Sequence, residues 1–521
     1  LSLFAGGELN STDRQYNWFR GWGYQYNNGG VPYLDYRLFK QSQEENSVYY
    51  SNDFTYYRNL AFFGMATYSY KGRYTINGTL RYEGTNKFGK SRQARWLPTW
   101  NVSGAWNAHE ERWWQPAFGK AWTYASLKGS YSLTADRGPA GVTNSLAVFS
   151  SFTPFRPSTS ASETGIQLYD LENSELTYEK KHELNIGVAL GFVDNRINIE
   201  FDWYRRNNFD LIGYVQTMGV GGQTTKLAND ATMESTGCEF TISTVNIKAK
   251  DFKWTTDWIF GWAENKITKL DSRSQVFQLV NGYGRMEGRP VGALYSIPFA
   301  GLTEEGLPTF FIDAAHTQVV GPGDYDAIYF QEYENVDYLK YEGTIDPKIT
   351  GSFGNTFSWK GLKLNVFFTY SFGNVLRLDA LCPVYSGDYS DLTASMKEMK
   401  NRWMVPGDEN VTNIPTIPTV RQMDEISSLN NAYSAYNYST ERVAKGDFIR
   451  LKELSLSYDL PKKVFEGQTA VSSFGVKLSA THLWLAYADK KLHGRDPEYY
   501  NTGGVSSPNP RQFTLTVKLG F

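Results

Sequence analysis

Hydrophobic and polar residues alternate along the last eleven residues of the chain, Arg511 to Phe521. The odd positions from Phe513 to Phe521 carry apolar side chains, and the even positions from Gln512 to Lys518 carry polar ones. A period of two predicts a β-strand with one apolar and one polar face. Two environments demand such a strand: the interior of a soluble β-sandwich, and the lipid around an outer-membrane barrel.

The same alternation recurs along the chain and predicts about fourteen strands, each close to the length that crosses a membrane when tilted. The predicted strands cover residues 1–9, 60–70, 73–82, 97–106, 123–133, 180–191, 196–209, 233–246, 252–266, 347–357, 362–373, 447–460, 474–487 and 511–521. We therefore predict an all-β fold, a transmembrane antiparallel β-barrel.

Short and long connections between these strands alternate from one end of the chain to the other. In outer-membrane barrels the short turns are periplasmic and the long loops extracellular, so the alternation favours a barrel over a sandwich. The predicted long extracellular loops lie near residues 15–58, 134–178, 267–346, 375–446 and 488–510, and we expect irregular structure in them. The short link around Trp113 and Trp114 should be helical and periplasmic, with both indoles as interface anchors.

Indole side chains gather on one face of the strand predicted at residues 252–266. Trp254, Trp258 and Trp262 share a parity with Phe260, and that much indole is natural at a lipid interface. The opposite parity must then face a lumen, because unpaired charges in hydrocarbon are costly. Cys238 should face lipid, too far from Cys382 for an obvious disulfide, so we expect two unpaired thiols.

Composition narrows the class of protein further. The 521 residues carry a net charge of -2, which gives no basic face for nucleic acid, and 16% are aromatic, which argues against disorder. No apolar run is long enough for a transmembrane helix. Because the chain starts at Leu1 in the middle of a predicted strand, we expect a missing N-terminal part. The strands that complete the barrel must come from that part or from another chain.

Several segments, in order, resemble the SusC/RagA-type TonB-dependent outer-membrane transporters of Bacteroidota. They are FFGMATYSYKGRYTINGTLRYEGTNKFG with RWLPTWNVSGAW, NSELTYEKKHELNIGVALGFVDNRINIEFDWYRRNNFDLI, EGRPVGALYSIPFAGL, DPKITGSFGNTFSWKGLKLNVFFTYSFGN, NRWMVPGDEN, KGDFIRLKELSLSYDLPKK and PRQFTLTVKLGF. The chain departs from the family in two places. The family usually has Asp-Gly-Ser-Ser-Arg-Phe-Gly where Glu83 to Gly89 stand, and Tyr-Gly-Thr-Thr-Gly-Asn near Ser130 to Asp136.

The resemblance implies a barrel of about twenty-two strands with an internal plug, of which this chain holds the C-terminal fourteen or so. It also implies location in the outer membrane, contact with its lipid, and TonB-dependent import of oligosaccharides or peptides. The implied partners are a SusD-like surface lipoprotein as a lid, and TonB with ExbB and ExbD acting through the missing N-terminal part. The plug, the TonB box and the N-terminal carboxypeptidase-like domain are absent from this sequence.

Import of a large solute calls for loop aromatics that stack on sugar rings or pack peptide side chains. The richest candidates lie in the first, fourth and last long loops: Trp18, Trp22, Tyr24, Tyr26, Tyr385, Tyr389, Tyr499 and Tyr500. The competing interpretation is that these rings pack the loops or the lid interface. Nearly neutral, aromatic-rich loops favour a glycan cargo over a strongly charged one, and a peptide remains the alternative.

The sequence offers no sign of catalysis, of a metal site or of a cofactor. No His, Cys or Ser lies in a nucleophile motif, and Glu304 with Glu305 is typical of solvated loop charges. The segment Gly219 to Gln223 lacks the Lys-Ser/Thr and the helix of a phosphate loop, and no metal-ligand spacing occurs. A passive porin and a secreted β-rich glycan hydrolase or binding protein are the two alternatives to a plugged importer.

Overall fold

The computed structural model describes most of the chain. The described residues are 1–21, 23–32, 35–45, 50–88, 92–137, 147–152, 165–219, 224–381, 397–461, 464, 471–500 and 510–521. They form two compact units, one made of Leu1–Gly104, Ser130–Leu184 and Asn207–Thr232, and the other of Ala105–Gly129, Asn185–Arg206 and Met233–Phe521. Within the described residues, no helix is long and apolar enough to cross a membrane.

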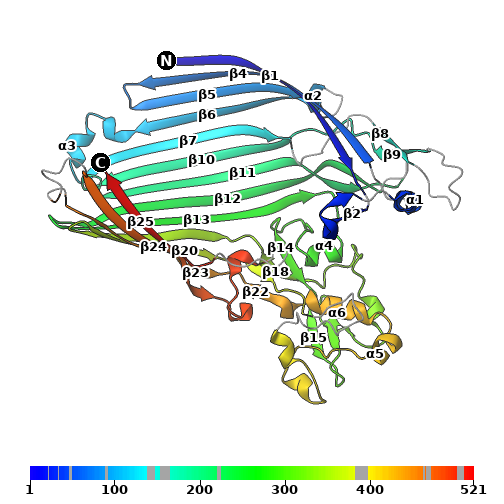
Figure 1. The fold of residues 1–521 in the computed structure, drawn as a ribbon. Helices are drawn as coiled ribbons and strands as arrows, with labels where there is room; N and C mark the ends of the chain where they lie inside the picture. Colours follow the sequence, from blue (N-terminus) through cyan, green and yellow to red (C-terminus); the bar gives the residue numbers. More distant parts are fainter. Residues whose placement is uncertain are drawn as a thin grey trace. The chain divides into compact units, whose positions relative to one another are not determined.

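An antiparallel sheet of fourteen strands dominates the structure (Figure 1). Its strands follow one another in chain order, so each is hydrogen-bonded to the next long strand along the sequence. They are β1 (Ser2–Phe19), β4 (Tyr50–Tyr70), β5 (Tyr74–Thr85), β6 (Trp96–Asn107), β7 (Trp122–Asp136), β10 (Glu179–Phe192), β11 (Ile197–Gln216), β12 (Thr225–Lys248), β13 (Phe252–Leu270), β19 (Ile349–Trp359), β20 (Leu362–Phe372), β23 (Phe448–Asp459), β24 (Ser473–Ala488) and β25 (Gln512–Gly520). The large antiparallel sheet expected from the alternation is therefore present.

The pairing of β25 with β24 gives this part of the sheet one apolar face and one polar face. Leu515 and Val517 of β25 pair with Leu478 and Val476 of β24, and all four lie on one face. That face is open, since Leu515 keeps 67% of its surface exposed. Polar residues alternate with these pairs on the opposite face. A soluble protein would cover such an apolar face with a second layer.

The tryptophans of β13 lie on one face, as their parity predicts. Trp254 pairs with Phe357 of β19, and Trp258 pairs with Phe353. Their indole nitrogens are satisfied within the sheet, because Trp254 Nε1 donates to Asn355 Oδ1 at 2.8 Å and Trp258 Nε1 to the Tyr370 hydroxyl at 2.9 Å. These bonds let large amphipathic rings remain on an apolar face without an unpaired N–H group.

The first connection differs from the irregular loop predicted near residues 15–58. Strand β1 continues to Phe19 and β4 begins at Tyr50, so the two strands pair well beyond the predicted boundary. A helix, α1 (Tyr36–Glu44), lies between them, with the small pair β2 (Tyr24–Gln25) and β3 (Val31–Pro32) and the turn η1 (Tyr26–Asn28). The Asp35 carboxylate accepts the Arg37 backbone N–H at 2.9 Å and starts the helix.

The link between β6 and β7 is helical, as expected, and contains η2 (Ala108–Glu110) and α3 (Trp114–Phe118). Trp113 is half exposed, whereas Trp114 is buried, with 3% of its surface exposed. Trp114 Nε1 donates to the Trp122 carbonyl at 2.8 Å, and its ring packs against Phe118. The prediction of an interface anchor is wrong for Trp114, because this ring forms the core of the link itself.

Two of the predicted irregular stretches, 267–346 and 375–446, instead build a folded body that we call the loop subdomain (residues 276–345, 375–381 and 397–445). Its core contains fully buried aromatic rings, among them Phe310, Tyr325 and Tyr436. Figure 1 shows α5, α6 and β15 gathered in this body. Its elements are α4 (Val276–Val280), β14 (Ala293–Ser296), β15 (Phe299–Leu302), β16 (Pro308–Phe311), β17 (Val319–Val320), η3 (Tyr325–Ala327), β18 (Lys340–Thr344), β21 (Val375–Arg377), η5 (Lys397–Asn401), η6 (Asp408–Asn410), α5 (Val420–Glu425), α6 (Leu429–Asn437), η7 (Thr440–Arg442) and β22 (Val443–Lys445). Short elements packed on a shared core left no long periodic signal in the sequence.

A partly buried arginine ties the segments of the loop subdomain together. Arg377 donates to the carbonyls of Val280 at 3.2 Å and Ser439 at 2.9 Å, and to Ser296 Oγ at 3.1 Å. Burial of this guanidinium lowers its pKa to about 10. The guanidinium thus donates to backbone carbonyls from both long connections. Moving either connection away would leave its carbonyl group without this hydrogen bond.

The remaining described elements are short. They are α2 (Arg92–Arg95), β8 (Val148–Phe152), β9 (Gly165–Asp170), η9 (Lys490–Leu492) and η10 (Pro497–Tyr499).

Truncation of a core ring should open the loop subdomain. Phe310 is fully buried, so Phe310→Ala should destabilise this body by about 3–5 kcal/mol through lost burial and a residual cavity. Faster hydrogen exchange across 276–345 would report the change. Val411→Ala is the matched control, because Val411 is 82% exposed, and it should leave exchange unchanged. Equal exchange in the two variants would contradict the assignment of a packed core.

Buried tyrosines should make the loop subdomain sensitive to alkali. Burial raises the pKa of Tyr295 to about 12 and the pKa of Tyr338 to about 12, above the ordinary value of about 10. The folded state favours the protonated phenols, so their stabilisation is complete below about pH 10 and is lost as pH rises through about 12.

The test is the absorbance of tyrosinate at 295 nm. At pH 11, Tyr295→Phe should leave this absorbance unchanged in the folded protein, because the buried phenol stays protonated, whereas the same substitution should lower it once the protein is unfolded in denaturant. A loss of absorbance in folded Tyr295→Phe would show that the Tyr295 phenol is accessible.

Candidate functional site

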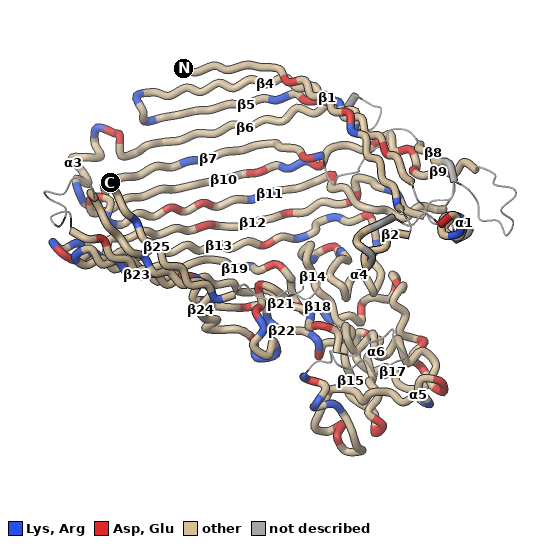
Figure 2. The backbone as a smooth tube through the Cα atoms, in the orientation of Figure 1, with Lys and Arg blue, Asp and Glu red and all other residues tan. Residues whose placement is uncertain are grey.

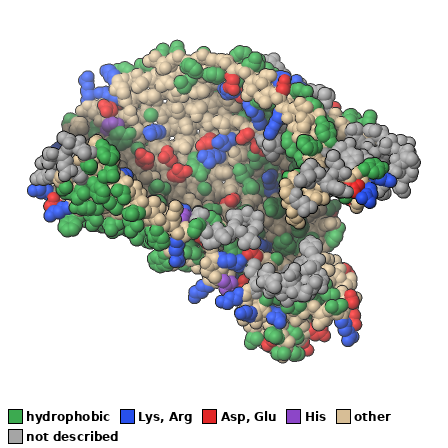
Figure 3. Space-filling view, viewed as in Figure 1, with side chains coloured by type: hydrophobic (Ala, Val, Ile, Leu, Met, Phe, Trp, Pro, Cys, Tyr) green, Lys and Arg blue, Asp and Glu red, His purple; other side chains and the backbone are tan. Residues whose placement is uncertain are grey.

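Charged residues are spread along the strands of the sheet (Figure 2), and the face turned toward the viewer in Figure 3 carries side chains of both signs of charge. In the second unit, a cleft of about 450 Å³ opens on the polar face of β20, β23, β24 and β25. Lys363, Lys477 and Lys518 line it together with Glu453 and Asp459. Such a surface suits a hydrated passage or a polar protein segment and does not suit lipid.

The candidate aromatics of the first connection lie in the first unit and differ in how open they are. Tyr24 and Tyr26 meet edge to face, with ring centroids 4.7 Å apart, and keep 50% and 83% of their surfaces exposed. Trp18 lies at the end of β1, with the Arg20 guanidinium 5.1 Å from its ring centroid. Trp22 lies outside the described residues. The tyrosine pair is thus the more accessible platform for a flat ligand.

The candidate tyrosines of the last connection are positioned by one buried arginine. Arg450, with 2% of its surface exposed, pairs through its two terminal nitrogens with Asp496 and Glu498. Its guanidinium also lies 5.8 Å from the Tyr499 ring centroid. Register places Arg450 opposite Thr369 on the polar side of the sheet. The fork therefore fastens residues 496–499 over the polar face at the end of β23.

Tyr500 is held by a second set of contacts. Its hydroxyl accepts the Asp379 backbone N–H at 3.4 Å, and the Arg495 guanidinium lies 4.7 Å from its ring centroid. Arg495 also pairs with the Asp379 carboxylate. Partial burial against Leu376 and Leu492 raises the pKa of the Tyr500 phenol. The last connection is thereby joined to the loop subdomain.

Tyr385 and Tyr389 lie outside the described residues. The structure thus brings Tyr499 and Tyr500 together in the second unit and Tyr24 and Tyr26 together in the first. An arginine covers part of each ring in the last connection, so these two tyrosines also have the packing role that we weighed against binding. Their contact with cargo stays a prediction.

Sequence reasoning missed a charge network on the polar face of the first unit, centred on Glu83. The Glu83 carboxylate accepts from Arg137 at 2.6 Å, Arg81 at 2.7 Å and Asn59 Nδ2 at 2.7 Å. Arg81 also pairs with Glu8 of β1 at 2.9 Å. The signal was present in the departures from the family, because Glu83 opens the unusual EGTNKFG segment and Arg137 directly follows SYSLTAD.

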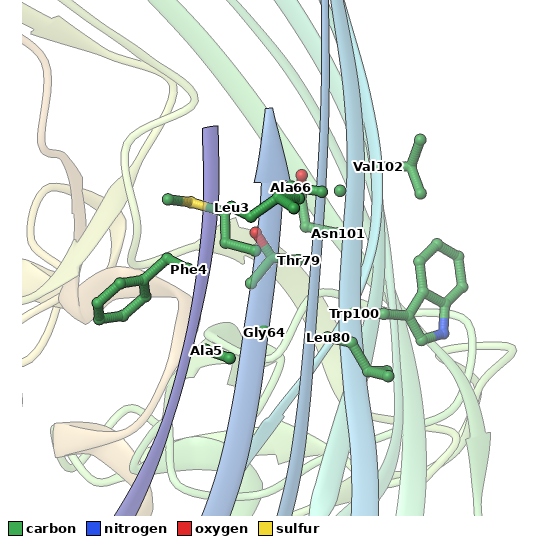
Figure 4. Close-up of a pocket in the computed structure, with 12 residues that line it drawn as sticks. Leu3, Phe4, Ala5, Gly64, Ala66, Thr79, Leu80, Trp100, Asn101 and Val102 are labelled. Carbon is green, nitrogen blue, oxygen red and sulfur yellow. The ribbon is translucent and has the colours of Figure 1, made fainter. Parts of the chain in front are cut away.

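The apolar face of the first unit also carries an open groove of about 740 Å³ across β1, β4, β5 and β6 (Figure 4). Small residues form its floor, and Leu80 and Trp100 lie on the same side of the strands while Phe4 points to the other side. Trp100 continues into a row of rings, with Tyr131 5.5 Å away and His182 5.7 Å beyond Tyr131. Rows of amphipathic rings of this kind mark membrane interfaces.

Comparison with known proteins brings these features together. TonB-dependent receptor P3 of Formosa agariphila is 26% identical over 88% of this chain and 45% of its own length. TonB-dependent receptor P26 of the same organism is 26% identical over 90% of this chain and 47% of its own length. TonB-dependent receptor SusC of Bacteroides thetaiotaomicron is 27% identical over 40% of this chain and 21% of its own length. The chain is a relative of the SusC/RagA-type TonB-dependent transporters. The resemblance predicted from the sequence motifs is thus confirmed.

Solved structures of transporters in this group share the fold. The RagAB peptide importer in its closed-closed state has a TM-score of 0.72 and 22% identity over 100% of this chain and 53% of that chain. The RagAB peptide transporter has a TM-score of 0.70 and 23% identity over 91% of this chain and 49% of that chain. The chain thus spans about half the length of the transporters that it matches. No protein-family model matches it.

Loss of the Arg450 fork should free the segment that carries Tyr499 and Tyr500. Arg450→Ala leaves the Asp496 and Glu498 carboxylates without their buried partner, which we expect to cost about 3–5 kcal/mol in local opening. Hydrogen exchange over residues 489–500 should rise by several orders of magnitude in Arg450→Ala and by less in Arg450→Lys, which keeps the charge. Arg421→Ala is the control, because Arg421 pairs with Glu425 at 82% side-chain exposure. Unchanged exchange in Arg450→Ala would contradict the positioning role.

Proposed function

We propose that this chain is the C-terminal part of an outer-membrane barrel that imports a large nutrient in a TonB-dependent manner. The observation that carries the proposal is the sequence similarity to TonB-dependent receptors over about nine-tenths of the chain. The two-faced sheet supports it, because one face is apolar and open while the other carries charge on its strands. Lipid and an aqueous lumen are the two solvents that such a sheet fits.

Strand dimensions agree with a membrane. The apolar face of β24 extends from Phe474 to Tyr487, roughly 43 Å at about 3.3 Å per residue. A tilt of about 45° reduces this to about 30 Å across the membrane, the thickness of a hydrocarbon core. Fourteen strands with open edges would expose unpaired backbone to lipid. We therefore infer that further strands of the whole protein complete a barrel of about twenty-two strands around a plug.

The cargo that we favour is an oligosaccharide. The exposed pair Tyr24 and Tyr26 offers ring faces on which a pyranose can stack. A peptide is the second candidate, favoured by the likeness in fold to solved structures described as peptide importers. A passive porin would share the sheet and would lack a plug and TonB coupling. The proposed partners are a SusD-like lipoprotein on the loop side and TonB with ExbB and ExbD on the other.

The deciding experiment is purification of the intact protein from detergent-solubilised outer membrane, with mass identification of every copurifying chain and bound molecule. We expect a SusD-like lipoprotein and oligosaccharide to be recovered. Bound peptide without sugar would overturn the cargo proposal and leave the transporter standing. An intact chain without a plug segment, recovered without a lipoprotein, would favour the porin.

The tyrosine pair should contribute directly to cargo affinity. A Tyr24→Ala/Tyr26→Ala variant should weaken binding of a fluorescently labelled neutral oligosaccharide mixture by about thirtyfold, since each of the two ring–sugar stacks contributes on the order of 1 kcal/mol. Isothermal titration or fluorescence anisotropy measures the change. Tyr214→Ala provides the control, because Tyr214 is an exposed aromatic elsewhere on the same unit. Equal affinity in both variants would remove Tyr24 and Tyr26 from the binding site.

A further inference from the structure

Three lysines surround a single carboxylate where β24 ends and the last connection begins. Asp489 accepts the backbone N–H of Lys445 at 2.8 Å through Oδ2 and that of Lys491 at 2.9 Å through Oδ1. Lys490 lies between Asp489 and Lys491 in the turn η9. All three lysines are exposed. We call Lys445, Lys490 and Lys491 the lysine cluster; blue segments gather beside β22 in Figure 2.

The carboxylate at the centre compensates only part of the positive charge. Burial disfavours ionisation of Asp489, yet the backbone N–H groups of Lys491 and Lys445 outweigh that effect and hold its pKa below the ordinary value. Asp489 is therefore ionised at neutral pH. Three ammonium groups against one carboxylate leave an excess of positive charge at this point of the surface.

Four of the neighbouring acidic groups pair with other cations. Asp496 and Glu498 pair with Arg450, and Asp379 pairs with Arg495. Glu398 pairs with the buried Arg442. These four carboxylates are thus directed toward arginines, and Asp447 accepts the Gly373 backbone N–H at 2.7 Å. The excess charge of the lysine cluster therefore favours an anion from outside the chain.

The height of the cluster along the strand indicates what that anion is. Trp484 and Tyr487 keep 58% and 46% of their surfaces exposed and pair with Leu451 and Ile449 on β23. Exposed aromatic rings at the end of an apolar strand face mark the boundary between hydrocarbon and head groups. Lys490 and Lys491 follow Tyr487 after three and four residues, in the turn η9, and Lys445 ends β22 beside Asp489. The cluster therefore lies just beyond this boundary, at the level expected of lipid head groups.

We propose that the lysine cluster binds phosphate groups on the head groups of glycolipid in the outer leaflet of the membrane. The proposal rests on the proposed function only for the membrane and for its orientation, with long connections outside. Ammonium groups attract phosphate as compact point charges, and each contributes on the order of 1 kcal/mol at a membrane surface. Lipid thereby contacts the chain beside the segment that carries Tyr499 and Tyr500.

The test compares three forms of the intact protein in nanodiscs that contain diphosphorylated lipid A: the wild type, Lys445→Gln/Lys490→Gln/Lys491→Gln, and Lys248→Gln/Lys250→Gln/Lys253→Gln. The last is a matched control, because its lysines flank the short turn between β12 and β13. Native mass spectrometry counts the lipid A molecules retained by each form. Dephosphorylated lipid A and inorganic phosphate at 10 mM serve as separate arms.

We expect the cluster variant to retain several-fold less diphosphorylated lipid A than the wild type and the control variant do, and the wild type to lose the same share when the phosphates are absent. Equal retention by the cluster variant, or equal binding of dephosphorylated lipid, would overturn the proposal. Full displacement by inorganic phosphate would assign the cluster to a free anion and overturn the lipid source. Flotation of each form with vesicles is measured first, since a protein that does not float contradicts the proposed membrane location itself.

Discussion

Strand register is the constraint on which the rest of this structure depends. Because side chains alternate with a period of two, a slip of one residue between β24 and β25 would exchange the whole apolar face for the polar one. It would place Lys518 and Lys477 among exposed leucines and valines. The uninterrupted ladders of β19 with β20 and of β13 with β19 carry the same information across neighbouring strands. The faces that define lipid and lumen in our proposal follow from this register.

Where the strands end, arginine side chains hold the connecting segments in place. Arg377 collects carbonyl groups from both long connections, and Arg450 collects two carboxylates from the last one. Both side chains are largely buried, so their planar donors act in surroundings where a lost partner is costly. The connections of the second unit are thereby organised as one body with fixed tyrosines. The aromatic pair of the first connection is presented differently, on a short strand and turn with its rings open.

The sheet could be predicted from the sequence because alternation acts locally and repeats in each strand, as β25 and β13 illustrate. The loop subdomain could not, because Phe310 and Tyr436 become core residues only when segments more than a hundred residues apart meet. Trp114 was misassigned for a related reason: nothing in its immediate sequence indicates that Trp122 returns to accept its N–H group. Among the candidate site residues, composition selected the loop aromatics, whose contact with cargo stays a prediction, whereas the arginines beside Tyr499 and Tyr500 were visible only in three dimensions.

The loop subdomain has a consequence for the order in which the chain can assemble. In the sequence, the hairpin formed by β19 and β20 separates its two principal segments, 276–345 and 397–445. Both segments contribute side chains to the same core. Closing this core joins segments separated by the whole hairpin, which carries a larger entropic cost than closing a local loop. Pairing of β19 with β20 brings the two segments together and lowers that cost. The loop subdomain can therefore fold only after this one hairpin has inserted into the sheet. A defect in the turn at Lys360 and Gly361 would consequently delay folding of the loop subdomain.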